Sequence, residues 1–563
     1  MEEKPEREIC SERDRQYWID KLIPVLFILL LPLLAHVFFT TRGFNLSEDG
    51  LVLAQSRRLL SGQIPCRDFI LTNPPGSAIL RMPILLVFGN YSIWMNRLFG
   101  WFQITCIAWL WILILEKTSS RKQSLLKRLF PVLAAFIFMS LSYDLSSNPV
   151  IDGLFLLSIA LYLVTGGGSG KLAWLGWLIS GFACLMHFAF FFFPFAAIIV
   201  LGKANKLRYW ILAITPSIIF ILFILLSGSF NQALDQIGSG MDLSKLGFAP
   251  YLWNSTFPWI AFVAIFLIQM KRGRSMIGPL RNKKGFQRFL GLLIFILFLA
   301  YHLYCSGKNQ ANVYKWQLYI SALGFGGFIY FAVREPERKG IIKSALLILI
   351  LCWCASSALM YDSPGPVAGL FIGWIIFVFY DGFIGFEVPR WSRGGVRLLT
   401  WLAVIVLLSL WVILRLKSLP PDVGKSQVYE PLGKNLYGAA GIKARKQITE
   451  VMEDLSNVIE KSGIDSYGIV PGIPSWWLSP RRDNPLPVDV YHPDGEFVRS
   501  RIIDQLKLEE KRERGKSAII IQKYLMRTYP ERRISPDQRY PLYTEIRKKW
   551  KKKGESKYFI VYE

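Results

Sequence analysis

Apolar runs long enough to cross a lipid bilayer recur along most of this chain, from residue 22 to residue 416. A spanning helix needs about 20 mostly apolar residues, because lipid offers no hydrogen-bond partner to an exposed backbone. Hydrophobic residues make up 52% of the 563 positions, and only 19% are charged. A soluble chain of this length would be expected to carry more charged residues. The runs are Leu22–Thr40, Ile93–Leu115, Leu129–Tyr143, Ile151–Val164, Leu172–Leu201, Tyr209–Ser227, Tyr251–Met270, Phe289–Cys305, Trp316–Val333, Ile341–Met360, Val367–Tyr380 and Leu398–Leu416.

One of these runs is too long for a single ordinary span. Leu172–Leu201 is interrupted by His187 and Pro194, so we interpret it as two short helices with a tight turn near His187. With that division, the sequence predicts a mostly α-helical, polytopic membrane protein of about 13 transmembrane helices.

The net charge of +26 is explained by where the Lys and Arg residues lie in the expected membrane topology, and it does not indicate a nucleic-acid-binding surface. With residues 1–21 inside, the inner loops hold most of the loop Lys and Arg, for example in KRGRSMIGPLRNKKGFQR at 271–288. This positive-inside asymmetry places the first loop, residues 41–91, on the outer face. We expect no nucleic-acid partner. The first apolar run lacks a small-residue cleavage site, which predicts a retained helix with a cytoplasmic N-terminus.

The last segment, residues 417–563, turns polar and predicts a separate domain. An odd number of spans puts it on the outer face, as an extracytoplasmic soluble domain after the transmembrane domain at 22–416. Strand-like runs at Gly468–Val470, Ala518–Ile521 and Tyr558–Tyr562 alternate with helix-like segments at Lys443–Ser462 and Glu496–Lys507, which predicts a small α/β fold. The seven cysteines are scattered and indicate no disulfide framework.

The first loop concentrates the polar residues that chemistry would need. Glu48 and Asp49 are adjacent, Arg57 and Arg58 follow on a predicted interfacial helix that ends at Gly62, and Asp68 adds a third carboxylate. A carboxylate at a low-dielectric surface has a raised pKa, which suits a general base near neutral pH. The alternative is structural, because Ser47 or Asp49 could cap the helix that follows.

Other chemistries find little support in the sequence. It contains no GxGxxG, P-loop, HExxH or CxxC motif, so nucleotide binding and structural zinc are not predicted. His36 and His302 have no diagnostic metal-ligand spacing. We expect no cofactor, although the sequence leaves a divalent metal open.

The first loop carries a pattern shared with a known family. The string E-D-G-x(6)-R-R-L-L-x-G-Q-x-P-x-R-D-F, from Glu48 to Phe69, with Asn73-Pro74-Pro75 after it, resembles the first outer loop of polytopic GT-C fold glycosyltransferases. The aminoarabinose transferase and protein O-mannosyltransferase groups (glycosyltransferase family 39) are the most similar. These proteins usually have Asp-Glu at the acid pair and Lys-Pro-Pro where this chain has Asn73-Pro74-Pro75.

The resemblance implies a reaction. A sugar would pass from a polyprenyl-phosphate donor to an extracytoplasmic acceptor with inversion, and a first-loop carboxylate would act as general base. Glu48 aligns with the usual catalytic Asp, but the reversed pair leaves Glu48 or Asp49 as the base. The acceptor could be a lipid, a glycan or a protein, and membrane lipids would surround the chain. The implied location is the bacterial cytoplasmic (inner) membrane, with the active site and C-terminal domain on the periplasmic face.

The resemblance also marks residues for substrate binding. A leaving phosphate needs positive charge, for which Arg57, Arg58 and Arg97 are candidates, while Asn73 replaces the family's Lys. Each has a plainer interpretation, for example an interfacial anchor at Arg97. Three further candidates complete the predicted site, namely Asp68 in the first loop, Asp152 at a helix start and His187 beside aromatic residues.

Two other classes of protein stay open. The reversed acid pair and the missing Lys fit a catalytically inactive, GT-C-like scaffold that keeps the fold. A membrane transporter is the third class, disfavoured because no inverted repeat or matched pair of interrupted helices is seen.

Overall fold

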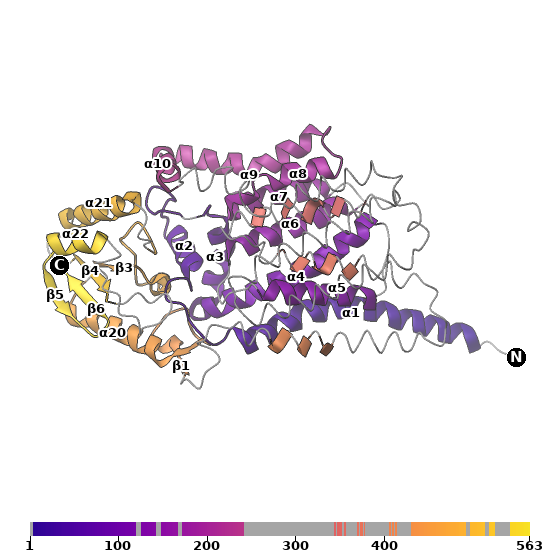
Figure 1. Ribbon diagram of the computed structural model, residues 1–563, viewed down its shortest axis with the longest axis horizontal. Helices are drawn as coiled ribbons and strands as arrows, with labels where there is room; N and C mark the ends of the chain where they lie inside the picture. Colours follow the sequence, from indigo (N-terminus) through magenta and orange to yellow (C-terminus); the bar gives the residue numbers. More distant parts are fainter. Residues whose placement is uncertain are drawn as a thin grey trace, which may run out of the picture.

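The computed structural model describes residues 4–71, 73–119, 125–141, 148–166, 172–240, 429–464, 466–490, 496–512, 517–523 and 541–563, with scattered helical residues between 340 and 413. Helices from the first 240 residues form an elongated bundle, and the chain from residue 429 forms a compact body at one end of it (Figure 1). The first loop lies at the junction of the two bodies.

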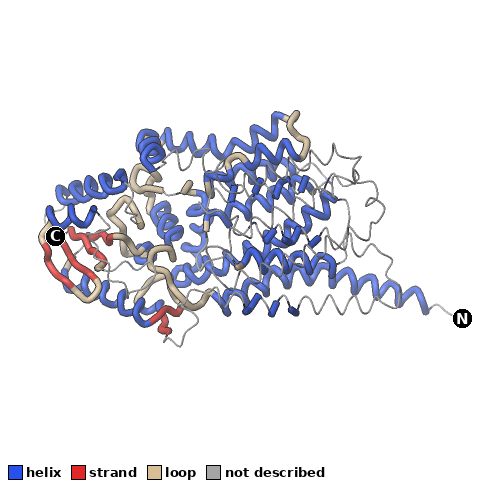
Figure 2. Tube along the Cα trace, viewed as in Figure 1, coloured by secondary structure: helices blue, strands red, loops and turns tan. Residues whose placement is uncertain are grey.

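The bundle consists of helices laid side by side, as the tube view makes plain (Figure 2). Its described helices are α1 (Lys4–Phe39), α2 (Leu51–Leu60), α3 (Gly76–Phe88), α4 (Ser92–Ser119), α5 (Leu125–Ser140), α6 (Pro149–Thr165), α7 (Ala173–Met186), α8 (Phe193–Val200), α9 (Leu207–Leu226) and α10 (Phe230–Gly240), with short 3-10 turns η1 (Gly89–Tyr91) and η2 (Phe188–Phe190).

The outer surface of the bundle is apolar, as membrane contact requires. Leu29 and Phe38 on α1 are 61% and 69% exposed, and Leu226 on α9 is 88% exposed. An apolar surface of this extent is rare on a soluble monomer. In the described part of the chain, three helical stretches are long and apolar enough to span a bilayer. The predicted class, a mostly helical polytopic membrane protein, is confirmed, whereas the predicted spans at 251–270, 289–305 and 316–333 lie outside the described residues.

The predicted division of the run Leu172–Leu201 is confirmed. Helix α7 ends at Met186, His187 is extended with φ −153°, and α8 begins at Phe193 after the turn η2. The His187 imidazole stabilises this turn, since Nδ1 accepts a hydrogen bond of 3.2 Å from the Ala189 backbone N–H. Two short helices thus replace one helix that would have overrun the bilayer.

The C-terminal body is a small α/β domain, as the sequence predicted. Its four-stranded sheet has the order β3-β4-β6-β5, with β3 and β4 parallel and the other pairs antiparallel. The elements are β1 (Tyr429–Pro431), η6 (Leu432–Lys434), β2 (Lys443–Arg445), α20 (Lys446–Ser462), β3 (Ser466–Val470), η7 (Pro474–Leu478), α21 (Glu496–Arg512), β4 (Ser517–Gln522), α22 (Pro541–Lys549), β5 (Lys552–Glu555) and β6 (Phe559–Tyr562).

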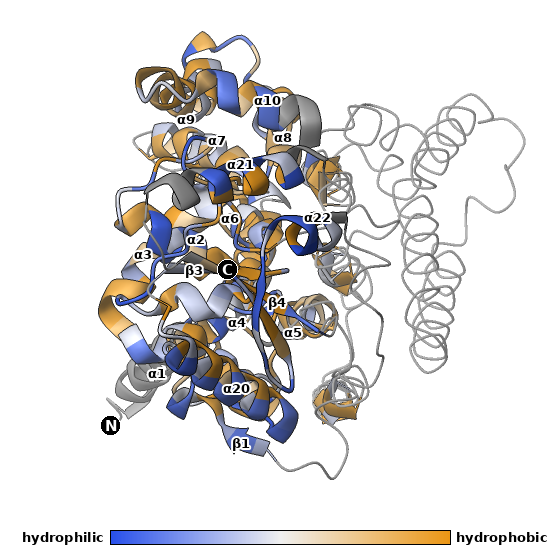
Figure 3. Ribbon diagram, turned by 90° about the vertical axis from the view of Figure 1, so that its left-hand side faces the viewer, coloured by the Kyte–Doolittle hydropathy of each residue, from blue (hydrophilic) through white to orange (hydrophobic). Residues whose placement is uncertain are grey.

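Helix α20 shows how the domain buries its core. Its inner stripe of Val451, Met452 and Leu455 is buried, and the opposite face is polar. Figure 3 shows this as alternating hydrophobic and hydrophilic patches along α20. The helix ends at Gly463, whose left-handed φ of 58° is the usual stop for an α-helix.

The first loop and the C-terminal domain share one hydrophobic core, so the two are packed together rather than merely tethered. The backbone adds to the contact, because Gly43 N–H donates to the Lys443 carbonyl (2.9 Å) and Ile70 N–H to the Pro487 carbonyl (2.7 Å). The buried side chains of this core are Phe44, Leu46, Leu53, Ala54, Ile84 and Ile93 with Leu432, Leu436, Ala439, Ile442, Ala444, Val451, Met452, Leu455, Ile469, Ile473, Trp476, Trp477, Leu478, Ile520, Tyr558 and Phe559.

Candidate active site

A tight turn before α2 fixes the Glu48-Asp49 pair. Gly50 follows the pair with a left-handed φ of +86°, and a Cβ there would lie 2.9 Å from Cα of Ser475 in η7. Glycine therefore suits this position on both backbone and steric grounds. Gly50 is itself the N-cap of α2, and no side chain caps the helix, so the capping interpretation of Ser47 or Asp49 is wrong.

Asp49 is held in a buried ion pair. The residue is 1% exposed, and its Oδ2 accepts hydrogen bonds from Arg97 Nη2 (2.8 Å) and the Asn45 backbone N–H (2.7 Å). Arg97, fully buried on α4, also donates to the carbonyls of Thr40 (2.5 Å) and Gly43 (3.1 Å). The pair therefore ties the end of α1, the acid turn and α4 together, and removing either partner would leave a buried charge.

Glu48 has the opposite environment from its neighbour. Its side chain is exposed on the turn, while Asp49 points into the protein. The two adjacent acids therefore differ in what they can do. Glu48 can meet a substrate, whereas Asp49 holds the turn that presents Glu48.

A second buried ion pair lies deeper in the bundle. Asp152, near the start of α6, accepts from Arg81 Nη1 (2.6 Å) and Nη2 (2.7 Å) and from Gln103 Nε2 (2.8 Å), and it is fully buried. Arg81 also donates from Nε to Asn96 Oδ1 (2.7 Å). This two-pronged geometry is the strong form of an arginine–carboxylate contact, and it joins α3, α4 and α6.

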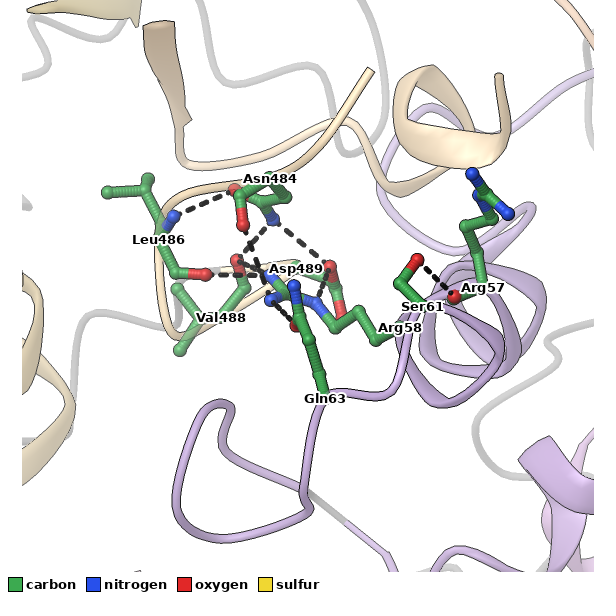
Figure 4. A network of polar contacts seen from close by, with 8 residues as sticks. All are labelled: Arg57, Arg58, Ser61, Gln63, Asn484, Leu486, Val488 and Asp489. Carbon is green, nitrogen blue, oxygen red and sulfur yellow. Dashed lines mark hydrogen bonds and ion pairs between the residues drawn. The ribbon is translucent and has the colours of Figure 1, made fainter. Parts of the chain in front are cut away.

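Arg58 connects the first loop to the C-terminal domain. From α2 it reaches Asp489 (Nε to Oδ1, 2.9 Å) and the carbonyl of Leu486 (2.7 Å), and it is 5% exposed (Figure 4). Asn484 reinforces the contact, since its Nδ2 donates to Asp489 Oδ1 at 3.1 Å. Arg58 thus organises the loop 484–489 instead of lying at a lipid interface.

Arg57 points away from that network in Figure 4. Its Nη2 donates to the Pro480 carbonyl at 3.2 Å, just after η7, and its Nε is buried without a partner among the described residues. Both arginines of the motif therefore contact the C-terminal domain, on two different sides of α2.

Asn73 and His187 come from segments that touch each other. Both side chains are partly buried. The link between the segments is Gly76, where a Cβ would lie 2.5 Å from the carbonyl oxygen of Leu185, and Ser77, whose hydroxyl donates to Met186 Sδ at 3.6 Å. The structure thus brings the Pro-Pro segment beside the turn at His187, although the two residues are distant in sequence.

Asp68 pairs with its neighbour Arg67 (2.9 Å) and accepts from the Ile64 backbone N–H (2.7 Å). The Arg67 guanidinium, through this hydrogen bond, is the main reason that the pKa of Asp68 lies below its usual value. Arg501 of α21 donates to the Arg67 carbonyl (2.8 Å), which adds a further contact between the first loop and the C-terminal domain.

A cleft of about 790 Å³ opens between the first loop and the C-terminal domain. The η7 segment forms one of its walls through Trp477 and at the same time backs the acid turn through Ser475. The lining residues are Arg58, Gln63, Arg67, Asp68, Ser466, Tyr467, Trp477, Arg481, Arg482, Asp483, Asn484, Pro485, Pro487, Arg501, Asp504 and Gln505.

Sequence reasoning missed Arg81, Asp489 and the arginines of the C-terminal domain. Arg81 carried a usable signal, because a lone arginine inside the apolar segment GSAILRMPILL needs a buried partner. Asp489 carried none, since its partner Arg58 is 431 positions away in the chain. Within the described residues, no group of three or more His, Cys, Asp or Glu side chains is placed to hold a metal ion.

Fold and site together define a polytopic GT-C type membrane fold with a C-terminal α/β domain packed on its first loop. A crystal structure of ArnT from Cupriavidus metallidurans bound to undecaprenyl phosphate is similar over 96% of this chain and 97% of that chain, with a TM-score of 0.50 and 11% sequence identity. The same protein in the apo state aligns over the same shares with a TM-score of 0.41, also at 11% identity. At this identity the likeness shows the fold alone.

Comparisons of the sequence alone find no similar protein. No family model matches the chain. No curated protein matches it either.

Proposed function

We propose that this protein is a membrane glycosyltransferase that moves a sugar from a polyprenyl-phosphate donor to an extracytoplasmic acceptor with inversion. One observation carries the proposal. In a GT-C type fold, the first loop presents one exposed carboxylate, Glu48, on a turn that a buried ion pair between Asp49 and Arg97 holds rigid. The solved ArnT structure of the same fold was determined with undecaprenyl phosphate, which supports a polyprenyl-phosphate ligand here.

In this mechanism Glu48 is the general base. It takes the proton of the acceptor hydroxyl as that oxygen attacks the anomeric carbon, and the bond from that carbon to the lipid phosphate breaks on the opposite side. Attack from the side opposite the leaving group inverts the anomeric centre. Asp49 is a positioning residue, since its carboxylate is engaged by Arg97 and the Asn45 backbone.

The leaving phosphate needs hydrogen-bond donors and positive charge. Arg97 and Arg58 are paired with Asp49 and Asp489, so their charges are already used. Among the predicted residues, the neighbouring segments of Asn73 and His187 offer polar groups at one place, and Arg57 retains a buried Nε without a described partner. We assign the phosphate to the place where the segments of Asn73 and His187 meet.

The orientation in the membrane is part of the proposal. The first loop and the C-terminal domain pack on the same end of the bundle, so both face one side of the bilayer. The distribution of Lys and Arg makes that side the outer face. For a bacterial chain this is the periplasmic face of the inner membrane.

The test is donor turnover by the full-length protein in lipid nanodiscs. We would supply a panel of polyprenyl-phosphate sugars with membrane extract as the source of acceptor, and measure release of the lipid phosphate. The proposal predicts turnover with at least one donor. Glu460→Gln, an exposed carboxylate on α20 away from the site, serves as a matched control and should leave the rate unchanged.

A catalytically inactive scaffold is the second candidate, favoured by Asn73 where the resembling family has Lys. It predicts that folded protein releases no lipid phosphate with any donor of the panel. A transporter predicts flux of the sugar-lipid or solute across proteoliposomes without cleavage of the donor.

A further inference from the structure

The cleft between the first loop and the C-terminal domain is built from polar residues that the reaction above does not use. Among its described lining residues, Arg58, Gln63, Arg67 and Asp68 come from the first loop and all others from the C-terminal domain. None of them belongs to a helix of the membrane bundle from α3 to α10. A ligand in this cleft would therefore arrive from the aqueous side.

Arginine dominates the lining, with five arginines against three aspartates. Two of the five are neutralised, since Arg58 pairs with Asp489 and Arg67 with Asp68. For Arg481, Arg482 and Arg501, the described part of the chain supplies no carboxylate within ion-pair distance. Three guanidinium groups thus line one cleft without a salt bridge to a described carboxylate, and Arg501 interacts with Asp68 only at longer range.

One contact within the C-terminal domain and one to the first loop hold two of these three cations in place. The Arg482 guanidinium lies over the Trp476 ring, 3.6 Å from its centroid, and Arg501 Nη2 donates to the Arg67 carbonyl at 2.8 Å. Partial burial lowers the pKa of Arg482, as expected of a cation that has lost water and gained no acidic partner. A guanidinium fixed in this way matches the two oxygens of a phosphate or carboxylate.

The rest of the lining suits hydroxyl groups. Gln63, Ser466 and Gln505 carry amide and hydroxyl groups, and the rings of Tyr467 and Trp477, 5.5 Å apart, form the inner wall. Sugar hydroxyls are matched donors and acceptors for such side chains.

We propose that this cleft binds an acidic saccharide, and that the acidic group, a phosphate or a carboxylate, belongs to the acceptor of the transfer reaction. The assignment to the acceptor rests on the proposed function. The donor phosphate is an unsuitable occupant, because its polyprenyl chain must stay in the bilayer and none of the described helices from α3 to α10 lines the cleft. The turn that carries Glu48 touches η7 through Gly50 and Ser475, and Trp477 of η7 lines the cleft, so η7 connects the cleft to the turn of the base.

The test measures binding of small probes to the full-length protein in nanodiscs at low salt. Saturation-transfer NMR reports the sugars through their C–H protons, and inorganic phosphate is measured by its competition with glucose 6-phosphate. The probes are glucose 6-phosphate, glucuronate, neutral glucose and inorganic phosphate. We expect one or both acidic sugars to bind more tightly than glucose, and the double variant Arg481→Gln/Arg501→Gln to weaken that binding about tenfold or more, since charge-assisted hydrogen bonds are lost. Which acidic sugar binds tells a phosphate from a carboxylate acceptor.

The matched control is Lys434→Gln/Lys461→Gln, which removes two exposed positive charges from the same domain outside the cleft. Equal weakening by this control would show only general attraction of anions and would overturn the proposal. So would equal affinity for glucose and the acidic sugars, or inorganic phosphate binding as tightly as glucose 6-phosphate. Thermal unfolding of each variant verifies that it is folded.

The two proposals can fail separately. Glu48→Gln should lose donor turnover and keep full affinity for the acidic sugar. Acidic-sugar binding without turnover of any donor would overturn the glycosyltransferase and the acceptor assignment, while the cleft would stand as a binding site. Donor turnover by a protein that does not prefer acidic sugars would overturn the cleft proposal alone.

Discussion

Two adjacent carboxylates in the same turn have opposite surroundings, and the surroundings decide their roles. Asp49 is 1% exposed and bonded to the fully buried Arg97, whereas Glu48 is exposed beside it. A buried ion pair adds little net stability over an apolar pair. Removing one partner, however, leaves the other charge buried, without compensation and away from water, which is strongly destabilising. The pair therefore holds the turn in place, and Glu48 is the acid of the two that solvent and substrate can reach.

We predict that Asp49→Asn destabilises the protein and that Glu48→Gln does not. Loss of the Asp49 charge takes the carboxylate away from the buried Arg97 guanidinium, at a cost of about 3–5 kcal/mol. Thermal unfolding in nanodiscs, followed by intrinsic tryptophan fluorescence, compares the two variants with wild type. An Asp49→Asn variant as stable as wild type would mean that the ion pair does not hold the turn.

At the scale of elements, α2 is one of the connections between the bundle and the C-terminal domain. Consecutive residues of a helix point about 100° apart, so Arg57 and Arg58 reach different parts of that domain. Arg57 contacts the Pro480 carbonyl, and Arg58 enters the loop 484–489 and pairs with Asp489. The same helix carries Leu53 and Ala54 into the shared core.

We predict that Arg58→Gln loosens the C-terminal domain far more than Arg57→Gln. The first change removes the ion-pair partner of the buried Asp489 carboxylate, while the second removes only one hydrogen bond to the Pro480 carbonyl. Hydrogen exchange of the segment 484–490 should rise strongly in Arg58→Gln and little in Arg57→Gln. The double variant Arg58→Gln/Asp489→Asn should be less destabilised than the sum of its single variants, because the two residues share one interaction. Strict additivity would contradict the assigned pairing.

The sequence predicts elements better than it predicts partners. The helix break at His187 and the strands β3, β4 and β6 follow from run length and apolar patterning, which are local properties. The pairing of Arg58 with Asp489, 431 positions apart, depends on how the domains dock, and no local pattern encodes it. The acid pair was visible in the sequence, but its division into an exposed and a buried member depends on Arg97 from another helix.

At the scale of the whole molecule, surface ion pairs make the stability of the C-terminal domain depend on pH. Glu555 on β5 contacts Lys523 (2.5 Å) and Lys552, and their hydrogen bonds lower the pKa of Glu555 from 4.5 to about 2. A carboxyl whose pKa is lower in the folded state stabilises that state above its unfolded pKa. This stabilisation is lost as the pH falls from about 4.5 toward 2.

We predict that the unfolding temperature of the C-terminal domain changes little between pH 7 and pH 5.5 and then falls as the medium is acidified below about pH 4.5. Glu555→Gln should reduce that acid-induced fall, because the variant lacks the titrating group. Exposed pairs are screened by salt, so the effect should shrink at high ionic strength. A wild-type protein whose unfolding temperature rises on acidification would contradict the sign of this shift.

The most direct measurement on the proposed enzyme is the initial rate of lipid-phosphate release by wild type, Glu48→Gln and Asp49→Asn, with a donor that wild type turns over. Loss of a general base should lower the rate by about 10²–10⁴-fold. We predict a loss of that size in Glu48→Gln with an unchanged unfolding temperature, and in Asp49→Asn a loss that accompanies destabilisation. A Glu48→Gln variant with the wild-type rate, beside a stably folded but inactive Asp49→Asn variant, would show that Asp49 is the base and that the roles assigned to the two acids are reversed.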